Sequence, residues 1–148
     1  MLIRCSIIFL LTIVSSSAIT DQRHNRLIRV LVSGATPNGG QVIGQIFNSE
    51  ENYLINSESG SIAEVDESGA AVLQFKVNDG GSYAVAVYQD QNGNSMLDRT
   101  FIGIPKEPVG ASNNPKSRFG PPKWKAARFS VTGEVTELEI QINSRQNQ

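Results

Sequence analysis

Oxygen-bearing side chains alternate along one short stretch of the sequence, residues 90–98, which reads Asp-Gln-Asn-Gly-Asn-Ser-Met-Leu-Asp. If this stretch reverses the chain direction, its side-chain oxygens can point to a common centre, joined by a backbone carbonyl. Such an oxygen cage suits a hard cation, above all Ca²⁺. The candidate ligands are Asp90, Asn92, Asn94, the Met96 carbonyl and Asp98, with Glu107 as a further carboxylate from the following segment.

The loop differs from an EF-hand, because Ser95 stands at position six and Phe101 at position twelve, where EF-hands have Gly and a bidentate Glu. Only two carboxylates, Asp90 and Asp98, lie in the loop itself. We therefore predict a structural Ca²⁺ with weak affinity, a Kd on the order of 10⁻⁴ to 10⁻³ M. Asp, Asn and Gly are also common turn residues that hydrogen-bond their own backbone, so a metal-free turn is the alternative.

A second group of residues with chemical potential is the basic and aromatic segment near the C-terminus. It contains Lys116, Arg118, Phe119, Lys123, Trp124, Lys125 and Arg128. A large aromatic side chain is more often part of a core than a binding platform, and charges often mark only a solvated face. The functional alternative is a surface contact through Arg118, Lys123, Trp124 and Lys125 with anionic glycans or lipid headgroups.

The N-terminus has the pattern of a secretory signal. Arg4 precedes an apolar run over residues 5–14, which is too short to span a membrane. The small residues Ser16, Ser17 and Ala18 follow, so we predict a signal peptide over residues 1–18. The product is then an exported protein, periplasmic or secreted, without a transmembrane segment after cleavage.

The remaining chain has the size of one domain. Its only cysteine, Cys5, leaves with the signal, so no disulfide is expected. The chain has 13 Lys and Arg residues against 14 Asp and Glu residues, and loss of Arg4 brings the formal charge to −2. A near-neutral balance argues against a nucleic-acid-binding protein, which would carry a basic excess.

Period-two alternation of apolar residues predicts strands along this domain. The predicted strands cover residues 26–33, 41–48, 71–77, 83–89, 124–131 and 135–142, with a weaker candidate at 61–66. The Asp79-Gly80 pair predicts a tight hairpin between strands 71–77 and 83–89. Residues 49–60 form a loop in which Tyr53, Leu54 and Ile55 are expected to contact the core. The segment 99–123, rich in Pro and Gly, reads as a long functional loop.

These patterns predict an all-β fold: a two-sheet antiparallel sandwich of about seven strands, immunoglobulin-like or transthyretin-like, with a small barrel as the alternative. The domain is expected to cover residues 26–143, between a flexible leader at 19–25 and a polar tail at 144–148.

Residues 44–143 resemble a bacterial family of exported domains of unknown function. The shared motifs are Tyr83-Ala84 followed by Asp90, then Asn92-Gly93-Asn94, Leu97-Asp98, Gly103-Ile104-Pro105 and Gly110-Ala111-Ser112-Asn113-Asn114. The resemblance implies a sandwich similar in outline to transthyretin-like and immunoglobulin-like domains, and no known activity. This chain departs from the family at Gln89, where members often have His, and at Ser95, where they often have Gly.

Together, these features predict an exported, non-enzymatic module that presents the long loop to a protein or polysaccharide at the cell envelope. Catalytic residues are scarce, since His24 stands alone in the leader and no Gly-x-Ser-x-Gly motif occurs. One alternative is a glycan hydrolase that uses Asp90 or Asp98 with Glu107 as a carboxylate pair. The other is a purely structural domain without a ligand.

Overall fold

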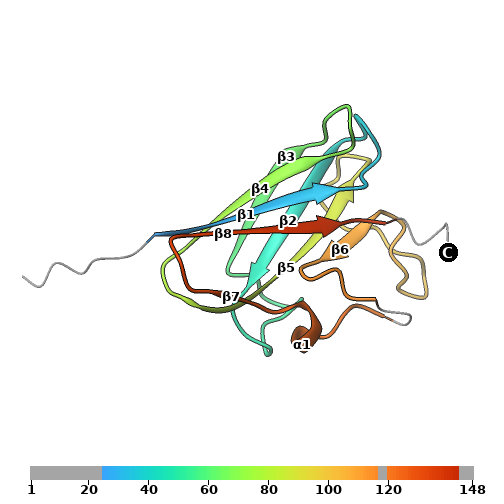
Figure 1. The fold of residues 1–148 in the computed structure, drawn as a ribbon. Coiled ribbons are helices and arrows are strands. Elements are labelled where there is room, and N and C mark those ends of the chain that lie inside the picture. The colour runs from blue at the N-terminus through green and yellow to red at the C-terminus, as the bar shows by residue number, and fades with distance from the viewer. Residues whose placement is uncertain (1–24, 117–119, 144–148) are drawn as a thin grey trace, which may run out of the picture.

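The computed structural model describes residues 25–116 and 120–143 and shows a β-sandwich (Figure 1). Within these ranges the chain forms eight strands and one short helix. None of the described helical structure is long and apolar enough to cross a membrane. The predicted signal segment 1–18, the leader through residue 24, the tail 144–148 and Arg118 and Phe119 lie outside the described residues.

The strands divide into two sheets that pack face to face, which confirms the predicted sandwich. The described three-stranded sheet has the order β4-β1-β8, with β4 at Ala71–Val77, β1 at Arg26–Ser33 and β8 at Val135–Gln141. The described five-stranded sheet contains β3 at Ser59–Glu64, β2 at Gln41–Phe47, β5 at Gly81–Asp90 and β6 at Val109–Ala111, in that order. Strand β7, Phe129–Val131, pairs with the start of β5.

The main core lies between the sheets, and the alternating sequences of β1 and β4 explain it. Ile28, Val30 and Val32 of β1 are completely buried, as are Leu73 and, nearly, Phe75 of β4. Each such side chain contributes roughly 1.5–3 kcal/mol by leaving water. The sheets approach closely at Gly44, where a Cβ atom would lie 2.5 Å from the Leu73 side chain.

A smaller cluster, which we call the outer cluster, covers the outer face of the five-stranded sheet, so β2 is apolar on both faces. Its buried members are Phe47, Tyr53, Ala84, Ala111, Trp124 and Ala127. Phe47 of β2 meets the ring of Tyr53 edge to face at 5.3 Å, and Tyr53 meets Trp124 at 5.7 Å. Ala84 leaves the space beneath these rings. Tyr53 therefore contacts the core as predicted, whereas Leu54 and Ile55 are exposed.

The sequence-based hairpin between residues 71–77 and 83–89 is wrong. Strand β4 pairs with β1, β5 pairs with β2, and the Asp79-Gly80 turn carries the chain from one sheet to the other. The turn residues permit a tight reversal, but the burial of both apolar faces against each other decides the outcome. The antiparallel prediction also fails at one described pairing, because β1 and β8 run parallel, with Leu27 opposite Val135.

The segment 124–131 is not a continuous strand, as the sequence predicted. Residues Trp124–Ala127 form the short helix α1, and only Phe129–Val131 forms strand β7. The helix places Trp124 and Ala127 on the outer cluster together, a spacing of three residues that a strand could not put on one face.

Candidate functional site

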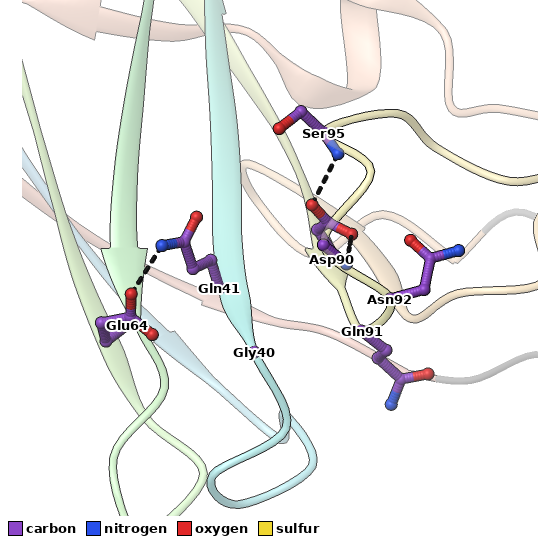
Figure 2. Close-up of a pocket in the computed structure, with 8 residues that line it drawn as sticks. Gly40, Gln41, Glu64, Asp90, Gln91, Asn92 and Ser95 are labelled. Atoms are coloured by element: carbon purple, nitrogen blue, oxygen red, sulfur yellow. Dashed lines mark hydrogen bonds between the residues drawn. The ribbon is translucent and has the colours of Figure 1, made fainter.

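The loop between β5 and β6 (Figure 1) is called the corner loop here and covers residues 90–107. It begins at a buried carboxylate. Asp90, the last residue of β5, is only 2% exposed. Its Oδ1 accepts hydrogen bonds from the backbone N–H groups of Gly93 (2.8 Å) and Asn94 (3.2 Å), and its Oδ2 accepts one from Ser95 (2.8 Å). Figure 2 shows the Asp90 side chain folded toward Ser95. Asp90 therefore fixes the first bend of the loop.

The corner loop ends at a second buried carboxylate, Glu107, which is 5% exposed. Its Oε1 accepts a hydrogen bond from Gln91 N (3.0 Å), and its Oε2 accepts one from Asp98 N (3.1 Å). Hydrogen bonds to an ionised acceptor are stronger than neutral ones, which makes the burial of this charge tolerable. Glu107 thus ties the end of the loop to its beginning and middle.

The negative charges of Asp90 and Glu107 affect the ionisation of Tyr88 on β5. Burial raises the pKa of the Tyr88 hydroxyl, and the nearby charges of Asp90 and Glu107 raise it further. The hydroxyl donates a hydrogen bond to the Ser95 carbonyl oxygen at 3.0 Å. The phenol therefore stays neutral and supports the outside of the first bend.

The other predicted ligands are bonded to one another. The side-chain Nδ2 atoms of Asn92 and Asn94 donate to Asp98 Oδ2 at 2.6 and 3.2 Å. Their Oδ1 atoms accept from the backbone N–H groups of Asn94 (3.1 Å) and Met96 (2.8 Å). The two amides thus present N–H groups, not oxygens, to Asp98. This is the geometry of a turn held by its own side chains.

The structure brings Asp90, Asp98 and Glu107 into one loop, yet their oxygens serve different backbone segments. In the described ranges, no three His, Cys, Asp or Glu side chains gather in a way that could hold a metal ion. The Met96 side chain is exposed. Binding of Ca²⁺ at this loop stays a prediction, and the hydrogen bonds favour its metal-free alternative.

Two positions where the chain departs from the motif pattern have clear structural roles. Ser95 has φ of 59°, a left-handed conformation that glycine adopts more readily. Gln89 is completely buried, its Oε1 accepts from Thr36 N at 2.9 Å, and its Nε2 donates to the Thr36 and Gly39 carbonyls at 2.9 and 2.8 Å. Gln89 therefore fastens the turn between β1 and β2 to β5.

The outer part of the corner loop, residues 98–106, forms a small hairpin that we call the tongue. Arg99 pairs with Pro105, Lys106 N donates to the Asp98 carbonyl at 2.9 Å, and Thr100 N donates to the Ile104 carbonyl at 2.8 Å. The turn closes through a 2.9 Å hydrogen bond from Gly103 N to the Thr100 carbonyl, with Gly103 at φ of 84°. A tight turn followed by a left-handed residue is a common short hairpin, and it explains the glycine.

The tip of the tongue is apolar and points into solvent. Phe101 is fully exposed, Ile102 is 65% exposed, and Ile104 is also exposed. The sequence predicted that the long loop is presented for contact, but it did not indicate which residues form the exposed surface. The signal lay in the order Thr-Phe-Ile-Gly, which places two apolar residues at the corners of a turn.

Trp124 is not available for the surface contact that the sequence predicted around it. Trp124 is 8% exposed and packs on Tyr53, so its indole belongs to the outer cluster. Lys123 and Lys125 flank it and are exposed, and Arg118 lies outside the described residues. What remains in the described chain is a pair of solvated lysines.

The Ser112-Asn113-Asn114 motif joins three elements. Ser112 Oγ accepts from Val85 N of β5 at 2.9 Å and donates to the Ala127 carbonyl of α1. The Asn113 amide donates to the Ala126 and Arg128 carbonyls. The Asn114 amide donates to the Glu139 carbonyl at 3.1 Å and accepts from Gln141 N at 2.8 Å, as a neighbouring strand would. The motif is structural.

A shallow pocket lies beside the first bend, between β2, β3 and the end of β5 (Figure 2). Gln41, Glu64 and Asp90 line it, and Gln41 Nε2 donates to Glu64 Oε1 at 2.5 Å. Asp98 and Glu107, the partners considered for a hydrolytic pair, are not among the described residues that line it. Asp90 reaches the pocket while its oxygens hold the bend.

Comparison with known proteins identifies the family of this chain. Residues 30–139 match the model of a family described as an uncharacterized protein conserved in bacteria, DUF2141. No curated protein and no solved structure matches the chain.

Proposed function

The chain belongs to that uncharacterized bacterial family, and from this premise we propose that it is an exported, non-enzymatic β-sandwich module that makes contacts through its tongue. The sandwich supplies a stable support, and the corner loop supplies the contact. Its partner is a component of the cell envelope. Export rests on the signal-like residues 1–18.

The observation that carries this proposal is the exposed tip on a well-fastened loop. Side chains such as Phe101 are normally withdrawn from water, and a fully exposed phenylalanine beside an exposed isoleucine marks a contact site. Asp90 and Glu107 fix the base of the loop, and hydrogen bonds within residues 98–106 fix its end. Binding through a preformed loop costs less conformational entropy than binding through a loose one.

The roles of the carboxylates support a non-enzymatic function. Asp90 and Glu107 accept hydrogen bonds from the backbone that they bend, and Asp98 accepts from Asn92 and Asn94. A hydrolase needs one carboxylate as an acid and a second as a base or nucleophile on either side of a substrate. Here the same oxygens are used to shape the loop.

The contact is tested by placing a photo-crosslinking phenylalanine analogue at position 101 in cells that make the full chain. We expect crosslinked products in the envelope fraction. The matched control places the analogue at Ile62, an exposed apolar residue of β3, and should give few. Equal products from the two positions would contradict the proposal. The export step is tested separately, because the recovered protein should begin at Ile19.

A further inference from the structure

We infer that the tongue docks the module on an anionic phospholipid bilayer, with Phe101 and Ile102 inserted among the headgroups. This inference rests on the proposed function and names the partner that the tongue contacts. The shape of the tip is the first argument. Its two apolar side chains stand at the corners of a tight turn, so the surface is convex. A bilayer interface yields around such a side chain, whereas a rigid partner would need a matching cavity.

Charge along the tongue is the second argument. The tongue contains two cations, Arg99 and Lys106, and one acid, Asp98, at its first residue. The Arg99 guanidinium donates a hydrogen bond from Nη1 to the Gly103 carbonyl at 3.2 Å, which holds its positive charge beside the tip. Amphipathic membrane contacts place apolar side chains in the interface and cations at the level of the lipid phosphates.

Two of the three acidic groups of the corner loop are withdrawn from this surface, because Asp90 and Glu107 are buried at its base. The third, Asp98, is half-buried where the tongue begins and accepts hydrogen bonds from Asn92 and Asn94. The tip itself, residues 100–104, carries no acidic side chain, and Arg99 Nη1 reaches it at the Gly103 carbonyl.

Two other exposed apolar residues, Ile55 and Ile62, lie among acidic residues instead. Ile55 lies in a loop that also carries Glu50, Glu51 and Glu58, and Ile62 on β3 lies two residues from Glu64. An anionic surface would repel both neighbourhoods. These positions provide matched controls, because their loss removes exposed apolar groups of similar size away from the tongue.

The test is cosedimentation of the chain from Ile19 onward, which retains every described element, with protein-free vesicles. One set of vesicles contains phosphatidylglycerol and phosphatidylethanolamine, and the other contains phosphatidylcholine alone. We expect binding to the anionic set, reduced about tenfold or more by F101S/I102S because two apolar side chains no longer leave water. Arg99→Gln should reduce binding several-fold at low salt and have little effect at high salt. The I55S/I62S control should bind like the parent.

A Phe101→Trp variant distinguishes insertion of the tongue tip into the bilayer from adsorption at the bilayer surface. Trp124, the only tryptophan of the parent, is buried in the outer cluster and serves as the internal reference. Brominated lipids should quench the added tryptophan and leave the emission of the parent unchanged. Equal binding by the parent and F101S/I102S, or no binding to anionic vesicles, would overturn the inference. If crosslinks from position 101 to an envelope protein persisted in that case, the proposed function would stand with a protein as its partner.

Discussion

The conformation of the corner loop depends on a few single residues, above all the carboxylates of Asp90 and Glu107. Asp90 and Glu107 are almost fully buried, and each accepts hydrogen bonds from backbone N–H groups of the bends. A hydrogen bond to a charged group contributes about 1.5–3 kcal/mol, so each carboxylate is important for the loop shape. The sequence identified both residues. It could not show whether their oxygens face an ion or the backbone, because Asp and Asn side chains serve either use.

Ser95 offers a test of the bend itself. It adopts φ of 59°, and its backbone makes the hydrogen bonds to Asp90 and Tyr88, which glycine can also make. We expect Ser95→Gly to raise the free energy of unfolding by about 0.5–1 kcal/mol. The control is Ser130→Gly in β7, where the same change should lower it by a similar amount. Urea denaturation measures both, and a destabilised Ser95→Gly would contradict the assigned bend.

The charges of the corner loop predict a pH dependence at Tyr88. Burial and then the charges of Asp90 and Glu107 raise its pKa above 10.0, while burial raises the pKa of Tyr53 to about 12. A raised tyrosine pKa favours the neutral form in the folded state. Its contribution to stability is complete below pH 10.0 and is lost as the pH rises through the folded pKa.

We expect Glu107→Gln to lower the pKa of Tyr88, because the variant removes one of the raising charges. Absorbance titration of tyrosine ionisation measures the change, with the urea-unfolded chain as the reference near pH 10. Unchanged titration of Tyr88 in a folded Glu107→Gln chain would show that the carboxylate does not act on the phenol.

At the scale of elements, the local alternation of apolar and polar residues predicted most strands. It did not predict which strands pair with one another. The bounds of β1 and β4 match the sequence expectation because their buried and exposed residues alternate without interruption. The partner of β4 was missed because a turn such as Asp79-Gly80 suits a hairpin and a crossover equally well. Helix α1 was missed because four residues are too few to display a helical period.

The packing of the outer cluster predicts that replacing Trp124 strongly lowers the free energy of unfolding. Its indole covers β5 through Ala84 and contacts Tyr53, so Trp124→Ala should lower the free energy of unfolding by about 3–5 kcal/mol. Lys125→Ala on the same helix removes an exposed side chain, and we expect a change within about 0.5 kcal/mol. Chemical denaturation distinguishes these values, and similar effects of the two variants would mean that α1 does not pack as described.

The hydrogen bonds of the corner loop predict that Ca²⁺ does not raise Tm. A site with a Kd on the order of 10⁻⁴ M would raise Tm by about 5 °C in millimolar Ca²⁺. We expect no such rise over chelator, because Asp98 already accepts hydrogen bonds from Asn92 and Asn94 and the amide oxygens face the backbone. Mg²⁺ is the control. A rise specific to Ca²⁺ and lost in Asp98→Asn would restore the calcium interpretation.

On the scale of the whole molecule, a contact loop held by hydrogen bonds projects from a two-sheet support. Composition and period predicted the sandwich, since repeated alternation with turns leaves few other arrangements. The sequence predicted a long contact loop but not the residues at its tip, because exposed apolar residues such as Phe101 and Ile102 cannot be told from packing residues by type alone. The direction of a side chain at a turn depends on hydrogen bonds across the loop, which no linear pattern contains.

The central claim is that hydrogen bonds to Asp90 and Glu107 hold the tongue in one conformation without a metal. NMR relaxation of the backbone amides in the presence of chelator tests it most directly. The account predicts order parameters near 0.85 for residues 98–106, similar to those of β5, and a clear decrease for the same residues in Glu107→Gln. Values below about 0.6 in the parent chain would contradict it, because the tip would then belong to a flexible loop.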